Sequence, residues 1–526
     1  MLLRKHQRER SFALVGVGVH TLPPWLIGEQ MTQLATSSLT DRHAKVAAEV
    51  LPEVNLIIGA ERRSAGGGGT FDHVNPSTGL KQAEIPMASP KDVDDAVSAA
   101  RAAQRIWGTM KASVRRDVLL KFAELIRDYE HWTQLSVLEN GIPSQWAGIF
   151  AQGAYDWTSY YAAWADKLNG EVVAADDHDG FIYTVSEPYG VVASIITWNA
   201  PLLSLGMKLP AALAAGNTVV LKPAEFTPFT AMIYTELARQ AGIPDGVINV
   251  VPGGPEAGEA LVRHPGVDKV SFTGGPQTAQ AIMRGAADHL TPVLFELGGK
   301  GANLIFEDAD LAEAVPFSCG FAMANNGQGC ALPTRLLVQR PVYDQVLEQV
   351  VAITSAFKTG DPLDSDTYIG PLITATALDR VKGMIDAAVA SEAGRLVVGG
   401  ERVGGEFANG YFIPPTVFAD VDPTSDLAQR EVFGPVLSVI PFDTEEQAVQ
   451  LANATPYGLT DYIQTTNQRR VRRLIPQLRC GTVGVNTGSC TTHLAPFGGV
   501  GVSGFGREGG KAGIDEYVRV KSVWEK

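Results

Sequence analysis

The central part of the chain alternates between short apolar runs and longer amphipathic segments, and this alternation constrains the fold more than any other feature. The runs at 190–197, 217–221 and 247–251 contain no charged residue, as is typical of strands buried on both faces of a sheet. The segments 203–214 and 229–241 have the length and apolar spacing of helices. Strands and helices in this order predict a parallel, doubly wound sheet within an α/β fold.

The length of the chain predicts more than one domain. A protein of 526 residues is too long for one simple core, and strand and helix signals resume after Lys300. Two β-rich segments lie outside the alternation and predict a small arm, whose strands need partners for their edges. The expected division is a flexible N-terminal extension at 1–50, a first α/β domain at 51–169 and 189–297, a second α/β domain at 298–510, and the arm at 170–188 and 511–526.

Two further segments call for an interpretation. Residues 1–30 carry basic residues before an apolar run, as a secretion signal does, but no small-residue cleavage pattern follows. We interpret this stretch as an upstream start or an unstructured extension. The glycine-rich stretch 65–69 predicts a hairpin-like loop between two short strands.

Charge and cysteine content argue against several classes of protein. The net charge of −14 and the pI of about 5.2 do not suit a general nucleic-acid-binding protein. The four cysteines include no Cys-x-x-Cys pair and do not form a disulfide framework, which fits the reducing cytoplasm. The uncharged run 188–207 is long enough to span a membrane, but its two prolines and Asn199 favour a buried strand followed by a turn.

Five short motifs carry the chemistry. Residues 296–300 read Glu-Leu-Gly-Gly-Lys and 327–330 read Gly-Gln-Gly-Cys, so that a carboxylate and a thiol are 34 residues apart (330 − 296) in glycine-lined turns. Trp-Asn-Ala-Pro at 198–201, Lys-Pro-Ala-Glu at 222–225 and Glu-Val-Phe-Gly-Pro at 431–435 complete the set. Together they resemble the NAD(P)-dependent aldehyde dehydrogenase superfamily, from about residue 55 to the C-terminus.

Three residues are the candidates for catalysis. Cys330 is the expected nucleophile, because a thiolate forms a covalent adduct with an aldehyde. Asn199 and the backbone N–H of Cys330 are expected to stabilise the resulting oxyanion, and Glu296 to activate the water that hydrolyses the thioester. Taken singly, the three could be an inert buried cysteine, a turn-forming asparagine and a carboxylate paired to Lys300; the motif context favours the catalytic roles.

The cofactor site lacks the usual Gly-x-Gly-x-x-Gly pattern. The resemblance implies NAD, with NADP as the alternative, and no metal. Glu225 suits the ribose hydroxyls of NAD and would repel a 2′-phosphate, while glycines at helix starts let the pyrophosphate approach the backbone. The expected cofactor-binding residues are Ile196, Thr197, Trp198, Lys222, Glu225, Gly254, Gly258, Phe272, Thr273, Gly274, Gly275, Leu297, Glu431 and Phe433.

The substrate side is less constrained by the sequence. Ala200 and Met207 stand where many relatives carry aromatic residues, so we expect a wide tunnel, with Cys490 near its mouth. No Arg or Lys is placed by a motif to bind a second carboxylate, which favours an uncharged aliphatic, terpenoid or aromatic aldehyde.

The resulting hypothesis is a cytoplasmic aldehyde dehydrogenase that forms a homodimer or homotetramer through its arm. It converts an aldehyde to a carboxylic acid through a thiohemiacetal and a thioester. One alternative is an NADP-preferring semialdehyde dehydrogenase. The alternative from another class is a non-catalytic binding or structural protein on the same fold.

Overall fold

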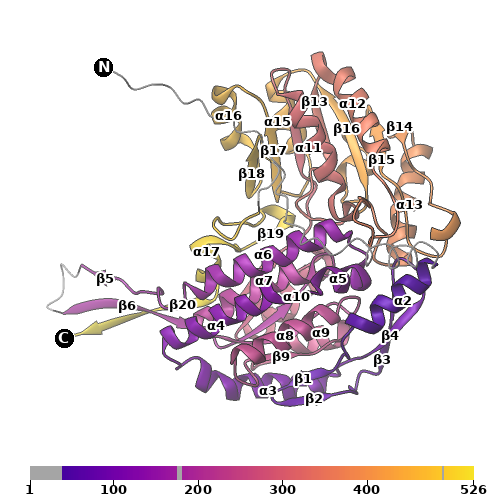
Figure 1. Cartoon of the computed structure of the whole chain (residues 1–526). Coiled ribbons are helices and arrows are strands. Elements are labelled where there is room, and N and C mark those ends of the chain that lie inside the picture. Colours follow the sequence, from indigo (N-terminus) through magenta and orange to yellow (C-terminus); the bar gives the residue numbers. More distant parts are fainter. Residues whose placement is uncertain (1–37, 175–179, 488–490) are drawn as a thin grey trace, which may run out of the picture.

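The computed structural model describes residues 38–174, 180–487 and 491–526, which form two α/β lobes and a projecting arm (Figure 1). The first lobe holds an eight-stranded sheet with the order β19-β11-β10-β7-β8-β9-β1-β2. Its parallel strands are β7 (Val191–Ile195), β8 (Thr218–Lys222), β9 (Ile248–Val250), β10 (Lys269–Thr273) and β11 (Val293–Glu296). Antiparallel edges come from β1 (Leu56–Ile58), β2 (Glu61–Arg63) and β19 (Gly504–Phe505).

Helices cover both faces of this sheet. Successive strand residues point to opposite faces, and apolar residues of the strands are buried on each face. Val192 and Val219 belong to a core cluster with α4 to α8, whereas Val191 and Val220 belong to a cluster with α3, α9 and α10. These helices are α3 (Pro90–Trp107), α4 (Ala112–Asp128), α5 (Trp132–Asn140), α6 (Ser144–Ala162), α7 (Pro201–Ala215), α8 (Phe229–Ala241), α9 (Pro255–Val262) and α10 (Pro276–Ala286). The predicted doubly wound sheet is confirmed.

The second lobe repeats this architecture with seven strands in the order β14-β15-β16-β13-β12-β17-β18. All pair in parallel except β14 with β15. The strands are β12 (Ala302–Ile305), β13 (Arg335–Gln339), β14 (Arg395–Val398), β15 (Thr416–Ala419), β16 (Val436–Phe442), β17 (Thr460–Gln464) and β18 (Thr482–Val485). The helices are α11 (Leu311–Met323), α12 (Tyr343–Ser355), α13 (Ala375–Ala390), α14 (Asp426–Gln429), α15 (Glu445–Ala452) and α16 (Gln468–Leu474).

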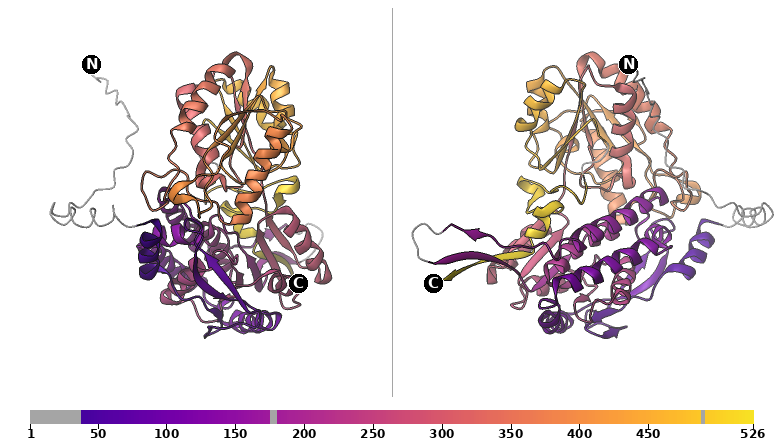
Figure 2. Two further views of the ribbon diagram at one scale, coloured as in Figure 1. Left: turned by 90° about the vertical axis from the view of Figure 1, so that its right-hand side faces the viewer. Right: turned by 60° about the vertical axis from the view of Figure 1, so that its left-hand side comes forward.

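The arm is a three-stranded antiparallel sheet that extends away from both lobes (Figure 2). It contains β5 (Val172–Val173), β6 (Phe181–Pro188) and β20 (Val518–Glu525), and α17 (Gly510–Asp515) precedes its last strand. We expected a monomer to leave the two long strands partly unpaired, and β20 is an edge strand of this sheet. β6 and β20 pair with each other in the same chain along their whole length, from Phe181 opposite Glu525 to Pro188 opposite Val518.

Three expectations about local structure need correction. Residues 39–50 were expected within a flexible extension, but Leu39–Val50 forms helix α2, whose N-terminus is capped by the Ser38 side chain. β19 lies in the expected second domain, yet it pairs with β11 of the first lobe. The loop 65–69 is not a hairpin: β2 belongs to the large sheet, and β3 (Thr70–Val74) pairs instead with β4 (Lys81–Pro86).

A membrane-spanning helix was considered for the uncharged run 188–207. That run contains the end of β6, the buried strand β7 and the start of α7. Within the part of the chain that the structure describes, no helix is both long and apolar enough to cross a bilayer.

Candidate active site

The site residues of the first lobe lie at one edge of its sheet. Strands β7, β8, β10 and β11 end at Ile195, Lys222, Thr273 and Glu296, and parallel strands bring their carboxyl ends to the same side. Ligand sites of doubly wound sheets lie at this edge. The second lobe adds Cys330, so the candidate site lies between the two lobes.

Cys330 occupies a constrained turn that follows helix α11. Asn325 and Asn326 just before it both have left-handed backbone, with φ of 49° and 59°, a conformation that asparagine tolerates better than most residues. Their side chains fasten the turn, because Asn325 Nδ2 donates to the Gln328 carbonyl at 3.1 Å and Asn326 Nδ2 donates to the Pro371 carbonyl at 2.8 Å. The thiol is half-buried and lines a large cavity.

The two glycines after Glu296 are required by close approaches. A Cβ atom at Gly298 would overlap the Glu431 carboxylate, and one at Gly299 would overlap the backbone carbonyl of Cys330. The Gly299 N–H also donates to Glu431 Oε1 at 2.9 Å. Three of the sequence motifs therefore meet here, and side chains at 298 and 299 would separate them.

Asn199 connects the first lobe to the Cys330 turn. Its Nδ2 donates to the Gln328 carbonyl at 2.8 Å, two residues before Cys330. Its Oδ1 accepts from the Thr197 hydroxyl at 2.9 Å, which fixes the orientation of the amide. Asn140 at the end of α5 donates to the backbone carbonyls of Trp198 and Asn199, at 3.1 and 3.3 Å. An amide with two hydrogens is thus held beside the nucleophile.

Glu296 is a buried carboxylate that faces the same cavity as Cys330. Neither of its side-chain oxygens has a hydrogen-bond partner among the described residues. Burial raises the pKa of the Glu296 carboxyl well above its ordinary value, and the charge of Glu508 raises it further, while the Lys208 charge acts in the opposite direction. An unpaired carboxylate with a raised pKa is suited to accept a proton near neutral pH.

The partner that the motif suggested for Glu296, Lys300, does not pair with it, and Lys300 Nζ has no hydrogen-bond partner among the described residues. Lys300 lies close enough to Glu431 to feel its charge, and burial lowers the pKa of the Lys300 ammonium to about 7. A different ion pair, Lys208 with Glu508, lies beside Glu296: Lys208 Nζ is 2.6 Å from Glu508 Oε1 and both side chains are buried. Sequence reasoning missed this pair.

The cofactor candidates cluster along the strand ends. Burial lowers the pKa of the Lys222 ammonium, and the charge of Glu225 opposes this effect, so the two side chains are close. A Cβ at Gly258 would lie 3.5 Å from Lys222 Cε, which places the start of α9 against the same lysine. Gly254 and Gly275 are the N-caps of α9 and α10. Apart from the glycine and its two chain neighbours, no described atom lies within 4 Å of the point where a side chain would begin at either N-cap.

These features fit a dinucleotide. Open backbone at two helix starts suits a pyrophosphate. Lys222, the last residue of β8, and Glu225, which follows the strand, suit a ribose. Ile196 and Thr197 continue β7, and Thr273 and Gly274 lie at the end of β10. The side chains of Phe272 and Leu297 are in contrast buried in the core of the first lobe, where they support the strand ends.

Glu431 and Phe433 come from the second lobe. Phe433 has a left-handed backbone (φ 51°), and its ring packs edge-on against Trp198 with centroids 5.3 Å apart. Burial raises the pKa of the Glu431 carboxyl to about 7. The two residues therefore reach the strand ends of the first lobe, where the expected nicotinamide end of the cofactor lies.

A cavity of about 640 Å³ leads to Cys330. Ala200 and Met207 line it as expected, but the predicted loss of aromatic bulk is offset by other elements: α6 and α11 supply Trp146, Phe150, Trp157, Phe317 and Phe321. These rings were missed because nothing in their local sequence marks them as facing a cavity. Cys490 falls outside the described residues. Cys319 and Cys480 do not line the cavity, and burial raises the pKa of the Cys319 thiol to about 12.

Comparison with known proteins agrees with this geometry. A sequence model described as the aldehyde dehydrogenase family matches residues 63–523. DhaS of Bacillus subtilis (strain 168), named as an aldehyde dehydrogenase, is 40% identical over 462 residues, which cover 87% of this chain and 92% of DhaS. The NAD+ complex of aldehyde dehydrogenase from Bacillus cereus has a TM-score of 0.88 and 40% identity, covering 91% of this chain and 98% of that one. Betaine aldehyde dehydrogenase from Staphylococcus aureus, also in complex with NAD+, has a TM-score of 0.88 and 34% identity, covering 91% and 95%.

The fold and these relatives define an oxidoreductase that acts on aldehydes. The chain belongs to the aldehyde dehydrogenase family.

Proposed function

We propose that this enzyme oxidises an uncharged, bulky aldehyde to the carboxylic acid, with NAD as the electron acceptor and water as the second reactant. The observation that carries the proposal is the cavity shared by three groups: the Cys330 thiol, the Asn199 amide and the buried, unpaired Glu296 carboxylate. A nucleophile, an oxyanion donor and a base in one cavity support oxidation followed by hydrolysis.

The chain's own residues account for each step. The Cys330 thiolate adds to the aldehyde carbonyl and forms a C–S bond, and the Asn199 amide with the Cys330 N–H donates to the oxygen that becomes anionic. Bound NAD supplies the acceptor for the hydride that leaves this carbon. Glu296 then takes a proton from water as the water oxygen attacks the thioester carbonyl. The C–S bond breaks, and the acid and the thiolate are released.

Glu225 supports a preference for NAD over NADP. A carboxylate at the adenosine ribose accepts hydrogen bonds from two hydroxyls but repels a 2′-phosphate. We expect kcat/KM for NAD to exceed that for NADP by at least about tenfold, or ~1.4 kcal/mol. Glu225→Gln should narrow the ratio, whereas Glu348→Gln, at an exposed position of α12, should not. Steady-state kinetics with one aldehyde provide the ratio. A preference for NADP in the unaltered protein would support the semialdehyde dehydrogenase alternative.

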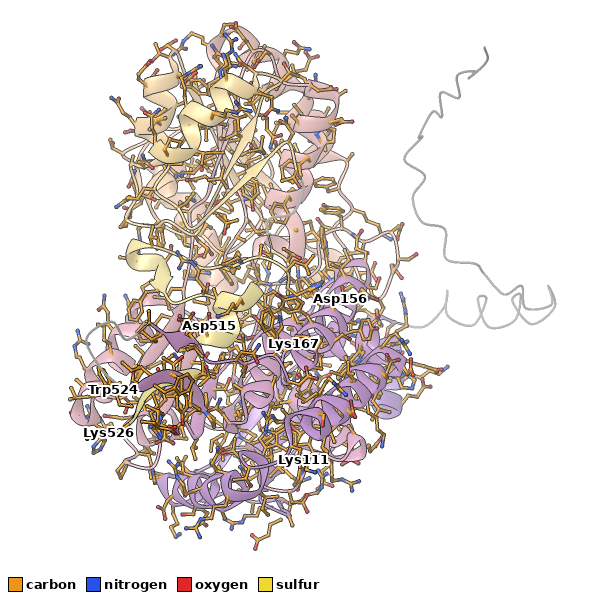
Figure 3. The ribbon with its side chains drawn as sticks, turned by 90° about the vertical axis from the view of Figure 1, so that its left-hand side faces the viewer. Lys111, Asp156, Lys167, Asp515, Trp524 and Lys526 are labelled. Atoms are coloured by element: carbon orange, nitrogen blue, oxygen red, sulfur yellow. The ribbon has the colours of Figure 1, made fainter. Side chains whose placement is uncertain are left out.

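The cavity wall supports the substrate class. Among the described residues that line it, none is Lys or Arg, whereas Asp156, Glu296 and Glu508 are acidic, and Glu508 is paired with Lys208. Asp156 lies on α6 near the boundary of the two lobes (Figure 3). An aldehyde with its own carboxylate would therefore find no cationic partner on the described wall.

A panel of aldehydes tests the function and this substrate class together. With NAD in excess, the rate of NADH formation per enzyme molecule should be highest for a branched or aromatic aldehyde. Its kcat/KM should exceed that of a carboxylate-bearing aldehyde by at least about tenfold. Failure of every aldehyde to yield NADH would favour the non-catalytic alternative.

The arm supports a homodimer or homotetramer. The outer edge of β20 ends the three-stranded sheet, and Val520 and Trp524 are exposed there, with 68% and 62% of their surface accessible; Trp524 is labelled in Figure 3. An unprotected apolar edge of this length favours pairing with a second copy.

Light scattering at micromolar concentration should show a multiple of 56.0 kDa. Trp524→Glu should lower that mass, whereas Leu290→Glu, at a still more exposed apolar residue of the first lobe, should not. A fully active species of 56.0 kDa would refute the oligomer.

The three described cysteines form no disulfide, which supports a reducing, cytoplasmic location for the assembly.

A further inference from the structure

Helix α2 is held to the protein by apolar residues near its two ends and by polar side chains on one turn. Of its twelve residues, Leu39, His43 and Val50 are buried. Arg42 forms ion pairs with Asp361, at 3.0 Å, and with Asp364, at 2.8 Å. The helix lies outside residues 63–523, the part matched by the family.

The hydrogen bonds of His43 define its tautomer. Asn75 Oδ1 accepts from a backbone N–H at 2.9 Å, so its Nδ2 faces His43 Nδ1, 3.0 Å away, and must donate to it. The hydrogen of His43 therefore sits on Nε2 and points to Asp361 Oδ1 at 3.0 Å. The ring thus bridges the first lobe, through Asn75, and the second lobe, through Asp361.

Asp361 depends on this helix. Burial alone would raise the pKa of its carboxyl, but the hydrogen bond from His43, the Leu363 amide and the Arg42 charge together hold that pKa below the ordinary value. Without α2 the carboxylate would be buried with less compensation, a situation that proteins relieve by rearranging. The segment that begins at Asp361 would move first.

This 361–373 segment leads directly to the active site. Tyr368 lines the substrate cavity, and its hydroxyl donates to the Gly320 carbonyl of α11 at 2.8 Å. The Gly370 N–H donates to Asn326 Oδ1 at 2.6 Å. The Ile373 N–H donates to Gln328 Oε1 at 3.1 Å. The segment therefore restrains both the cavity wall and the left-handed turn that precedes Cys330.

We propose that α2 is a positioning element for the acylation step: Arg42 and His43 hold Asp361, and the 361–373 segment passes this restraint to the turn that carries Cys330. The helix touches no reacting atom and acts through that segment. The proposal rests on the role of Cys330 proposed above. It predicts that α2 affects the reactivity of one thiol more than it affects cofactor binding.

The test compares Arg42→Ala/His43→Leu with the unaltered protein at a temperature where circular dichroism shows both to be folded. The rate of the first NADH turnover should fall by about tenfold, because small displacements of a nucleophile have large effects on rate. The rate at which iodoacetamide alkylates Cys330, measured by mass spectrometry of the peptide that contains it, should change by at least about threefold. The dissociation constant of NAD should stay within about twofold.

Matched variants separate positioning from stabilisation. Lys45→Ala, at an exposed residue of the same helix, and removal of residues 1–37 should leave both rates unchanged, whereas removal of 1–50 should reproduce the double variant. His43→Gln, whose amide can replace the Nε2 donor, should recover much of the loss. If the double variant does not fold, the same rates are measured on the single variant Arg42→Ala.

Two outcomes would overturn the proposal. Turnover and alkylation rates within about twofold of the unaltered protein, with only the thermal midpoint lowered, would make α2 a stabilising element alone. A loss of NAD affinity as large as the loss of the first-turnover rate would show a general disturbance of the first lobe. If no aldehyde gives NADH but alkylation still depends on Arg42 and His43, the proposed function fails and the positioning role stands.

Discussion

Cys330→Ala is expected to abolish NADH formation while NAD still binds. The substitution removes the atom that forms the covalent adduct, and no other described cysteine lines the cavity. Loss of a nucleophile typically costs several orders of magnitude, so we expect at least roughly a thousandfold decrease in kcat. NAD affinity, measured by fluorescence quenching or calorimetry, should remain within about twofold, because the expected cofactor contacts lie on other residues.

Cys480→Ala is the matched control for this experiment. Cys480 is half-buried, its thiol donates to the Thr482 carbonyl at 3.3 Å, and burial raises its pKa well above the ordinary value, so it should not react. Its replacement should leave turnover unchanged. Residual activity of Cys330→Ala within tenfold of the unaltered protein would exclude Cys330 as the nucleophile.

Glu296→Gln is expected to separate the two halves of the reaction. Acylation and hydride transfer need the thiol and the oxyanion donors, so a pre-steady-state burst of NADH should survive. Hydrolysis needs a base, so steady turnover should fall by about 10²–10⁴-fold. Stopped-flow measurement of NADH gives the burst and the steady phase from one trace, and unchanged steady turnover would show that another group activates the water.

The pH dependence gives a second test of Glu296. The carboxyl acts as a base only when it is deprotonated, and burial raises its pKa well above the ordinary value. Steady turnover should therefore rise with pH through this elevated pKa, and the slope should disappear in Glu296→Gln. Glu508→Gln removes the nearby charge that helps to raise the pKa, so the rising limb should move to lower pH. Movement to higher pH would contradict this account of the electrostatics.

Local patterns predicted the first lobe well. Helix α8 has the predicted bounds of 229–241, and β8 is displaced by one residue from the predicted 217–221. Both elements are buried and periodic, and their ends are set by glycine and proline, so short stretches of sequence contain the necessary information. Short motifs also marked Cys330, Glu296 and Asn199, and the structure brings all three to one cavity, while their catalytic roles stay predictions.

Features that depend on distant partners could not be predicted. Lys208 and Glu508 are 300 residues apart (508 − 208), and they meet because β19 brings the segment before Glu508 back to the sheet of the first lobe. The aromatic cavity wall comes from α6 and α11. Their orientation depends on distant elements of their own lobes, since α6 packs on α4 and α7 and α11 packs on α12 and β16. For the arm, alternation identified β6 and β20 as strands, but it contains no information on which strand pairs with which. Helix α2 was missed because its contacts with Asp361 and Asn75 are polar and distant.

The link between Asn199 and the Gln328 carbonyl has a consequence for any attempt to divide this protein. The oxyanion donor and the base are carried by the first lobe and the nucleophile by the second, so each lobe holds an incomplete catalytic apparatus. If the chain is cut after Glu296, the first half keeps the donor and the base. The second half carries the nucleophile together with β19 and β20, which complete the first-lobe sheet and the arm. Neither half should then be active alone. Activity then becomes a reporter of reassembly, since it returns only when the two halves dock closely enough for the Asn199 amide to reach its carbonyl.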